Sequence, residues 1–204
     1  MMSPFEKIDA ARIACGFLTV RETLEVLEGN LVLDPFSTLV SASVGFGRNN
    51  VIYPGVTLRA SGAAAIVFAD ENTLHAGTLI EASHGDVTIG SNNQFGEGGF
   101  TAKANRDGAR IQIGSNGRYL NNPSVFGACC LGDGTQILGN ITVDSCSLGD
   151  GGSFMEPDPD LRGGLLKGSG VARNLCIPKG KVIVGNGTIS EDNLLPQSHF
   201  HPKS

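Results

Sequence analysis

Five ionisable side chains in the first half of the sequence have the chemistry for acid–base catalysis. His75 and His84 carry imidazoles, which accept and donate protons near neutral pH. Glu81 lies three residues before His84 and could orient its imidazole, and Arg59 and Glu97 complete the set of candidate catalytic residues. A structural alternative stays open for each. A histidine on a strand is more often structural, and Arg59, Glu81 and Glu97 could form an ion pair between subunits.

Two groups of basic residues could bind the phosphate groups of a ligand. The first is Lys103 and Arg106, in a segment that also contains Arg110. The second is Lys179 and Lys181, near the end of the sequence. The alternative for both groups is ordinary solvated surface charge. The sequence contains neither a GxxxxGK[ST] phosphate-binding motif nor a GxSxG nucleophile motif.

The composition argues against several classes of function. The 204 residues carry 15 Lys and Arg against 20 Asp and Glu, and a net charge of −5 disfavours a general nucleic-acid binder. Five cysteines without CxxC spacing disfavour a disulfide framework or a zinc cluster. The longest apolar runs have eight residues, far fewer than the roughly 20 that span a membrane. We therefore expect a cytoplasmic protein with no membrane span and with reduced thiols.

A repeat of six residues predicts the elements that must position these side chains. Large, mostly apolar residues recur at every sixth position, a period typical of neither helices nor alternating strands. Three hexads make one turn of a triangular β-solenoid, in which the large residue points inward and a small neighbour permits a tight corner. A β-sandwich, the alternative, would have period two. The series contains Val40, Phe46, Ile52, Leu58, Phe68, Leu74, Ile80, Ile89, Phe95, Thr101, Ile113, Tyr119, Val125, Leu131, Ile137, Val143, Leu148, Phe154, Val171, Ile177 and Ile183.

Smaller side chains are predicted to point inward four places after an aliphatic residue. Thr78, Asn93, Cys129 and Thr135 occupy such positions. Cys130 follows Cys129 directly, so on a strand the two thiols must point to opposite faces.

The repeat divides the chain into three parts. Residues 1–39 form an N-terminal extension, in which Ser3–Glu6 has the pattern of a capping box and predicts a short helix that shields the open end of the solenoid. Residues 40–187 form the β-helix, with loop insertions at 61–65, 82–86, 103–109 and 151–170. Insertions in solenoids often carry binding groups. Residues 188–204 form a C-terminal tail, in which we expect Glu191–Ser204 either to be poorly ordered or to dock on a neighbouring molecule.

The pattern from Val40 to Gly187 resembles the hexapeptide-repeat superfamily of left-handed parallel β-helices. The resemblance implies an all-β fold, and the left-handed winding is part of that implication. The run Ile177-Pro-Lys-Gly-Lys-Val-Ile-Val-Gly185 is similar to the ending of many acyltransferases of this superfamily. In this sequence Asn186-Gly187 replaces the more usual Pro-Ala.

The resemblance also implies a function, which is transfer of an acyl group from acyl-CoA at a groove between subunits of a homotrimer. A histidine, either His75 or His84, would be the base that deprotonates the acceptor. The two basic groups described above would meet the phosphates of CoA.

Residues Val56–Ala102 are also similar to γ-class carbonic anhydrases and to the small β-helical subunits of dynactin. The three metal-binding histidines of γ-class enzymes fall on Glu81, Glu97 and Ala102, and a glutamine near the metal falls on His75. Leu58-Arg59-Ala60-Ser61 keeps the arginine of the γ-class Leu-Arg-Gly-Asp run and loses the aspartate. Because three neutral nitrogen ligands are lost, ordinary carbonic anhydrase activity is disfavoured.

Two alternatives to acyl transfer follow from this second resemblance. His75, Glu81 and Glu97 could form an altered metal site, because carboxylates and imidazole bind Mn, Fe or Zn; which metal is unknown. The chain could instead be a non-catalytic scaffold that binds a protein partner, within a homo- or heteromeric assembly.

Overall fold

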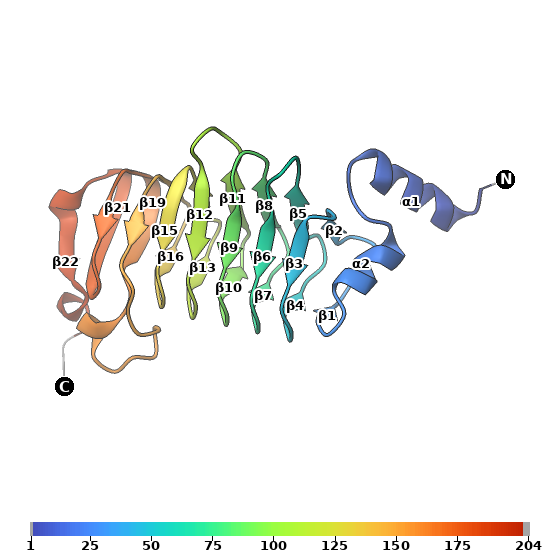
Figure 1. Cartoon of the computed structure of the whole chain (residues 1–204). Helices are drawn as coiled ribbons and strands as arrows, with labels where there is room; N and C mark the ends of the chain where they lie inside the picture. Colours follow the sequence, from blue (N-terminus) through green and yellow to red (C-terminus); the bar gives the residue numbers. More distant parts are fainter. Residues whose placement is uncertain (1, 202–204) are drawn as a thin grey trace.

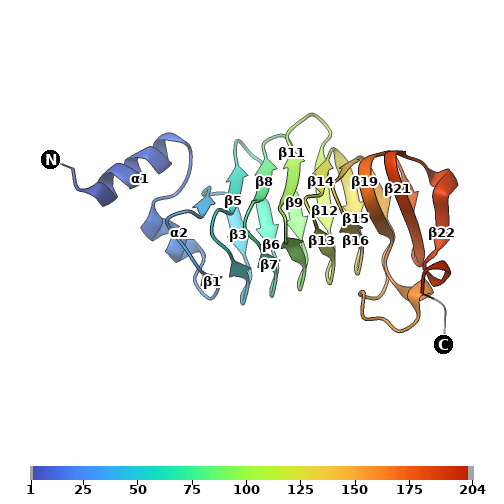
Figure 2. The same cartoon turned by 180° about the vertical axis from the view of Figure 1, so that it is seen from behind.

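The chain folds into parallel β-sheets whose strands stack along one axis. The computed structural model describes residues 2–201. It is mainly β, with 41% of residues in strands and two α-helices, an arrangement consistent with a parallel β-helix. Figure 1 shows helices α1 (Pro4–Ala14) and α2 (Val20–Val26) at the N-terminal end of the stack, and Figure 2 shows the same arrangement from behind.

Within residues 2–201 the stacked strands form three columns, and successive turns of the chain add strands to each. The first column contains β1 (Leu31–Val32), β4 (Val51–Ile52), β7 (Thr73–Leu74), β10 (Gln94–Gly96), β13 (Arg118–Leu120) and β16 (Gln136–Leu138). The second contains β2 (Leu39–Val40), β5 (Thr57–Ala60), β8 (Thr78–Ala82), β11 (Phe100–Ala104), β14 (Ser124–Phe126) and β17 (Ile141–Asp144). The third contains β3 (Val44–Phe46), β6 (Ile66–Phe68), β9 (Val87–Ile89), β12 (Arg110–Ile113), β15 (Ala128–Leu131), β18 (Ser147–Leu148) and β20 (Cys176–Ile177).

Two long strands end the stack. β19 (Leu165–Arg173) pairs first with β16 and then with β17, so it continues both the first and the second column. β21 (Lys181–Ile189) pairs along β19, and β22 (Leu194–Pro196) adds an antiparallel strand at the edge.

The register of the strands accounts for the period of six. Arg118 pairs with Gln136, 18 positions later, so that turn is three hexads without insertion. Several turns are longer because the segments 61–65, 83–86, 105–109 and 149–164 leave the parallel strands, whereas Cys130 pairs with Ser147 only 17 positions later. The inward residues of the predicted series are buried, as expected for a close-packed core. They are Val40, Ile52, Leu58, Phe68, Leu74, Ile80, Ile89, Phe95, Ile113, Tyr119, Val125, Leu131, Ile137, Val143, Leu148, Ile177 and Ile183.

Phe46, a further member of the series, packs against the core but is only partly buried, and the predicted series is wrong at three positions. The corner Gly96–Gly99 holds one residue more than a hexad allows, so Ala102 rather than Thr101 takes the inward position beside Ile80. Val171 lies on the outward side of β19. Phe154 lies in the insertion after β18 and is 39% exposed. In each case an extra residue or a loop, which a fixed period does not capture, displaces the side chain.

A ladder of asparagine side chains runs through the interior along one corner of the stack. Each Nδ2 donates to the Oδ1 of the asparagine one turn earlier, over 2.8–3.0 Å, in the series Asn30, Asn50, Asn72 and Asn93. Each Oδ1 also accepts the backbone N–H of the next member, and the N–H of Gly117 bonds to the last one. These amides satisfy backbone groups that a buried corner would otherwise leave unpaired.

The four small residues that the sequence places inside the solenoid are buried, so that prediction is confirmed. They are Thr78, Asn93, Cys129 and Thr135.

The N-terminal helices cover one end of the core. The predicted capping box between Ser3 and Glu6 is confirmed, and it begins α1. Leu27, directly after α2, is buried within the hydrophobic core of the stack. Strand pairing already begins at Leu31, so the stack reaches into the segment predicted to be an extension.

The C-terminal segment has a defined structure up to residue 201, so the expected disorder is wrong there. Short 3₁₀ turns at Glu191–Asn193 and Gln197–His199 flank β22. The buried side chain of Gln197 donates from Nε2 to the carbonyl of Gly163 at 2.7 Å. Residues 202–204 of the predicted tail lie outside the described part. Across residues 2–201, no helix has the length and apolar character needed to cross a membrane.

Candidate functional site

His75 lies directly after β7, at the corner between the first and second columns. Its side chain is 20% exposed. The backbone N–H of His75 bonds to the carbonyl of Phe95, and its own carbonyl accepts the Thr78 hydroxyl, both at 2.8 Å. The imidazole packs against the ring of Tyr53, with the ring centroids 4.7 Å apart. One side of the imidazole is therefore held by an aromatic ring, while part of it stays open to solvent.

Glu97 approaches the same imidazole from the next turn. Its Oε1 lies 4.0 Å from the Nε2 of His75. Glu97 has φ of 48° in a run with Gly96, Gly98 and Gly99, all of which have positive φ. A Cβ on Gly96 would lie 2.6 Å from the Cβ of His75, so only glycine fits there. Positive φ at a non-glycine residue recurs elsewhere in the stack, for example at Glu71 and Asn92, and at this corner it brings a carboxylate to the edge of the imidazole.

Tyr53 was missed by the reasoning from sequence. It directly follows the inward Ile52, as His75 follows the inward Leu74. Two aromatic side chains at the same hexad position in successive turns must be neighbours. The hexad spacing of Tyr53 and His75 therefore predicts the contact between the two rings.

Arg59, Glu81 and Lys103 form a separate row along the second column. They are register partners on β5, β8 and β11. The Nζ of Lys103 lies 3.5 Å from the Oε2 of Glu81, and the guanidinium of Arg59 lies 5.0 Å from the centre of the Phe17 ring. These charges contact one another or the N-terminal segment within one chain, whereas an ion pair between subunits stays a prediction.

The remaining candidates lie at other corners. His84 is exposed in the loop after β8, with Nδ1 at 3.2 Å from the Ser83 hydroxyl. Arg106 pairs with Asp144. Partial burial disfavours ionisation of Asp144, but hydrogen bonds from Arg106 and Ser145 outweigh it and lower the pKa of Asp144. The structure therefore does not place His84 or Arg106 beside His75.

Lys179 and Lys181 lie at the far end of the stack. From β7 to β21 the first column takes five steps, by way of β10, β13, β16 and β19. At about 4.8 Å per step, that is about 24 Å from the strand next to His75. Within one chain these lysines and His75 can share only a long ligand.

The proposed altered metal site gains no support from the geometry. Among residues 2–201, no group of three or more His, Cys, Asp or Glu side chains is placed to hold a metal ion. Glu81 pairs with Lys103, whereas Glu97 faces His75. Ala102, at the third ligand position of the γ-class resemblance, is buried in the core.

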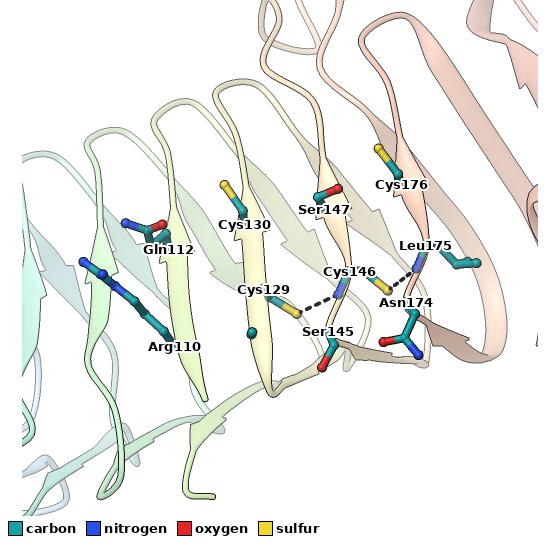
Figure 3. A pocket seen from close by; sticks show the side chains of 11 residues that line it. Arg110, Gln112, Cys129, Cys130, Ser145, Cys146, Ser147, Asn174, Leu175 and Cys176 are labelled. Atoms are coloured by element: carbon teal, nitrogen blue, oxygen red, sulfur yellow. Dashed lines mark hydrogen bonds between the residues drawn. The ribbon is translucent and has the colours of Figure 1, made fainter. Parts of the chain in front are cut away.

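The third column carries a shallow hollow of about 380 Å³ that contains four cysteines (Figure 3). Cys130 and Cys176 are exposed, whereas Cys129 and Cys146 are buried, as predicted for the adjacent pair Cys129 and Cys130. The Sγ of Cys129 accepts the N–H of Cys146 at 3.3 Å, and the Sγ of Cys146 accepts the N–H of Leu175 at 3.4 Å. Burial raises the pKa of Cys129 to about 11 and also raises that of Cys146.

We expect the five thiols to alkylate in two classes. Near pH 8, a thiol with a pKa of about 11 is roughly one thousandth thiolate, and only the thiolate reacts. Exposed Cys15, Cys130 and Cys176 should therefore react with iodoacetamide first, and Cys129 and Cys146 only after unfolding in urea. Peptide mass spectrometry of timed samples measures this. Equal rates for Cys129 and Cys130 in the folded protein would contradict the assignment.

Comparison with protein-family models, with curated protein sequences and with solved structures gave no significant match.

Proposed function

We propose that the chain is a left-handed, triangular β-helix of the hexapeptide-repeat class and that it transfers an acyl group from acyl-CoA, with His75 as the base. Support for the architecture comes from three parallel columns and a turn of three hexads. Support for the activity comes from one observation. His75 is held between the Tyr53 ring and the Glu97 carboxylate at a strained corner, yet stays partly open to solvent.

The chemistry needs one base in the right protonation state. The Nε2 of His75 accepts the proton of an acceptor hydroxyl or amine while the acceptor atom attacks the thioester carbonyl. The C–S bond then breaks, and the imidazolium returns the proton to the departing sulfur of CoA. Glu97 stabilises the imidazolium electrostatically, and Tyr53 fixes the ring orientation.

The phosphates of CoA need a basic surface with free charges. Lys103 and Arg106 are engaged by Glu81 and Asp144, whereas Lys179 is exposed. We therefore place the phosphates of CoA near Lys179 and Lys181, with the pantetheine arm extended along the stack. A second copy of the chain in a homotrimer would supply the other wall of this groove.

The test is release of CoA from acetyl-CoA in the presence of hydroxyl and amine acceptors. Chromatography should follow the product, because the exposed cysteines would consume a thiol reagent. We expect His75→Gln to lower kcat by about 100-fold or more, the usual contribution of a general base, with little change in KM for acetyl-CoA. Glu97→Gln should have a smaller effect.

His84→Gln is the matched control, because His84 is exposed and lies at another corner. It should leave kcat unchanged. Equal losses in the two histidine variants would remove the assignment of His75. Changing Lys179 and Lys181 to glutamine together should raise KM without lowering kcat. An unchanged KM would place the CoA phosphates elsewhere.

A partner-binding scaffold is the second candidate, and a different observation favours it. Large apolar side chains are exposed on the N-terminal segment, which Figure 1 shows at one end of the stack. They include Phe5, Ile8, Ile13, Leu24 and Phe36. Exposed apolar patches of this kind are typical of interaction surfaces. Absence of acyl transfer, together with no thermal shift at millimolar CoA, would make this candidate the leading one.

A further inference from the structure

A larger hollow, of about 530 Å³, lies on the first column near the C-terminal end. Its floor is made by outward residues of β13, β16, β19 and β21, including Leu138, Val182 and Val184. Phe154 from the insertion and Phe200 from the C-terminal segment also line it. Its volume falls within the usual range for small-molecule sites.

The charge of this hollow has one sign. Arg118, Arg162 and Lys167 line it, and none of the described lining residues is an aspartate or a glutamate. His201 also lines the hollow. Such a concentration of cations between apolar walls attracts an anion.

One nitrogen atom of the Arg118 side chain lacks a hydrogen-bond partner among the described residues. Its Nε is buried and, among the described residues, has no hydrogen-bond acceptor. Its guanidinium carbon lies 4.2 Å from the centre of the Phe154 ring, a cation–π contact that holds the planar group against the wall. A buried donor without an acceptor costs free energy, and an anion held in the hollow by the other nitrogens of the same guanidinium would offset that cost electrostatically. A planar guanidinium fork fits a carboxylate especially well.

The walls of the hollow are fixed by contacts elsewhere. Gln197 is buried and donates to the carbonyls of Gly163 and Lys181, which ties the C-terminal segment to the insertion and to β21. A Cβ on Gly163 would lie 2.6 Å from the carbonyl of Asp133, so the insertion returns to the stack in close contact. The Nε of Arg162 donates to the carbonyl of Glu156 at 2.7 Å. The hollow is therefore largely formed before any ligand binds.

We propose that this hollow binds a small carboxylic acid with an apolar or aromatic body. The carboxylate lies on the Arg118 guanidinium, with Arg162 and Lys167 adding positive charge. The hydrocarbon part packs on Leu138, Val182 and Val184 between the two phenylalanine rings. The hollow includes Val182, next to Lys181, so it lies beside the groove proposed for CoA, but its test uses neither acetyl-CoA nor an acceptor and stands apart from the test of acyl transfer.

The test uses ligand-detected NMR and titration calorimetry with benzoate, phenylacetate and hexanoate as probes. We expect saturable binding of at least one carboxylate and at least tenfold weaker binding of its neutral amide. Arg118→Gln should weaken carboxylate binding tenfold or more, because a charge-assisted pair is lost. Its melting temperature should change little, because loss of the contact with the Phe154 ring is offset by removal of a buried Nε that has no acceptor.

Arg110→Gln is the matched control, because Arg110 is exposed on β12 in the other hollow. It should bind the probes as the parent protein does. Phe154→Leu provides a second variant that removes the wall behind Arg118 and should also weaken binding. The proposal is overturned if no probe binds, if acid and amide bind equally, or if inorganic phosphate binds more tightly than every carboxylate. Equal losses in the Arg110 and Arg118 variants would also overturn it.

Discussion

We expect Asn72→Leu to lower the free energy of unfolding by about 3–5 kcal/mol, with a fall in melting temperature of roughly 6–20 °C. Asn72 is fully buried in the middle of the asparagine ladder. Its Oδ1 accepts both the backbone N–H and the Nδ2 of Asn93, at 3.0 and 2.9 Å. Leucine has a similar size but cannot accept either bond, so the buried N–H of Asn93 is left without a partner.

The size of the effect follows because losing one partner of a buried hydrogen bond costs more free energy than the bond contributes when both partners are present. A satisfied bond contributes about 1 kcal/mol, but an orphaned buried group costs about 1–3 kcal/mol. Asn72→Leu also ends the bond from the Nδ2 of Asn72 to Asn50, so the ladder is cut on both sides. The groups lost are in one network, so their contributions do not add simply.

Urea unfolding followed by circular dichroism measures this difference. Asn140→Leu is the matched control, because Asn140 is exposed at a corner between β16 and β17 and should change stability by less than about 0.5 kcal/mol. A loss of under about 1 kcal/mol for Asn72→Leu would mean that the ladder contributes little to the corner.

The asparagine ladder shows which structural features the six-residue repeat predicts and which it does not. Asn93 lies four places after the aliphatic Ile89, where a small side chain is predicted to point inward. Asn50 and Asn72 lie at the same distance after Phe46 and Phe68, so the same spacing covers them once aromatic residues are counted with the aliphatic ones. Burial at these positions was therefore predictable. That the amides join into one chain of hydrogen bonds depends on the register between turns, which the sequence does not state.

The failures of the repeat have a common physical origin. Thr101 is displaced by one residue because the corner Gly96–Gly99 uses positive φ angles, and one of its members is the non-glycine Glu97. The same corner brings Glu97 to His75, so the position that breaks the pattern also builds the candidate site. Phe154 leaves the series because it lies in the insertion after β18, and there it lines the hollow that contains Arg118.

The sequence identifies the charged candidate residues, but it does not predict which of them lie close together in the structure. Arg59, Glu81 and Lys103 fall on one row because the insertions between them leave the register of β5, β8 and β11 intact. Arg106 lies in the loop after β11 and reaches Asp144 on β17, two strands further along the second column, so its partner depends on the conformation of the loop. Loop lengths were visible in the sequence, whereas loop conformations were not. Most of the fold was therefore predictable and much of the site was not.

The second large effect is expected at the N-terminal end, where Arg12→Met should lower the free energy of unfolding by about 3–5 kcal/mol. Arg12 is 5% exposed, and burial lowers its pKa while Asp9 opposes the shift. Its five N–H groups have five acceptors: the carbonyls of Leu18, Pro35, Phe36 and Thr38 and the hydroxyl of Thr23. Methionine packs in similar space and satisfies none of them.

Arg21→Met is the matched control, because Arg21 is exposed on α2 and pairs only with exposed Glu25. Exposed pairs of this kind contribute less than about 1 kcal/mol. Urea unfolding of the two variants under the same conditions gives the comparison. Similar stabilities would mean that the Arg12 bonds are replaced by water, and that the end of the core tolerates an open N-terminal segment.

The Arg12 variant also separates two roles of the N-terminal segment. Loss of the Arg12 bonds should loosen α1 and α2 from the stack and uncover Leu27 and the edge strands, which favours association through exposed strand edges. Phe5→Ser should leave the core covered, because Phe5 is exposed on α1. If sedimentation shows that Phe5→Ser dissociates an assembly without loss of stability, the apolar surface of the segment is an interface. If only Arg12→Met changes the assembly, and towards larger species, the segment acts as a cover for the end of the solenoid.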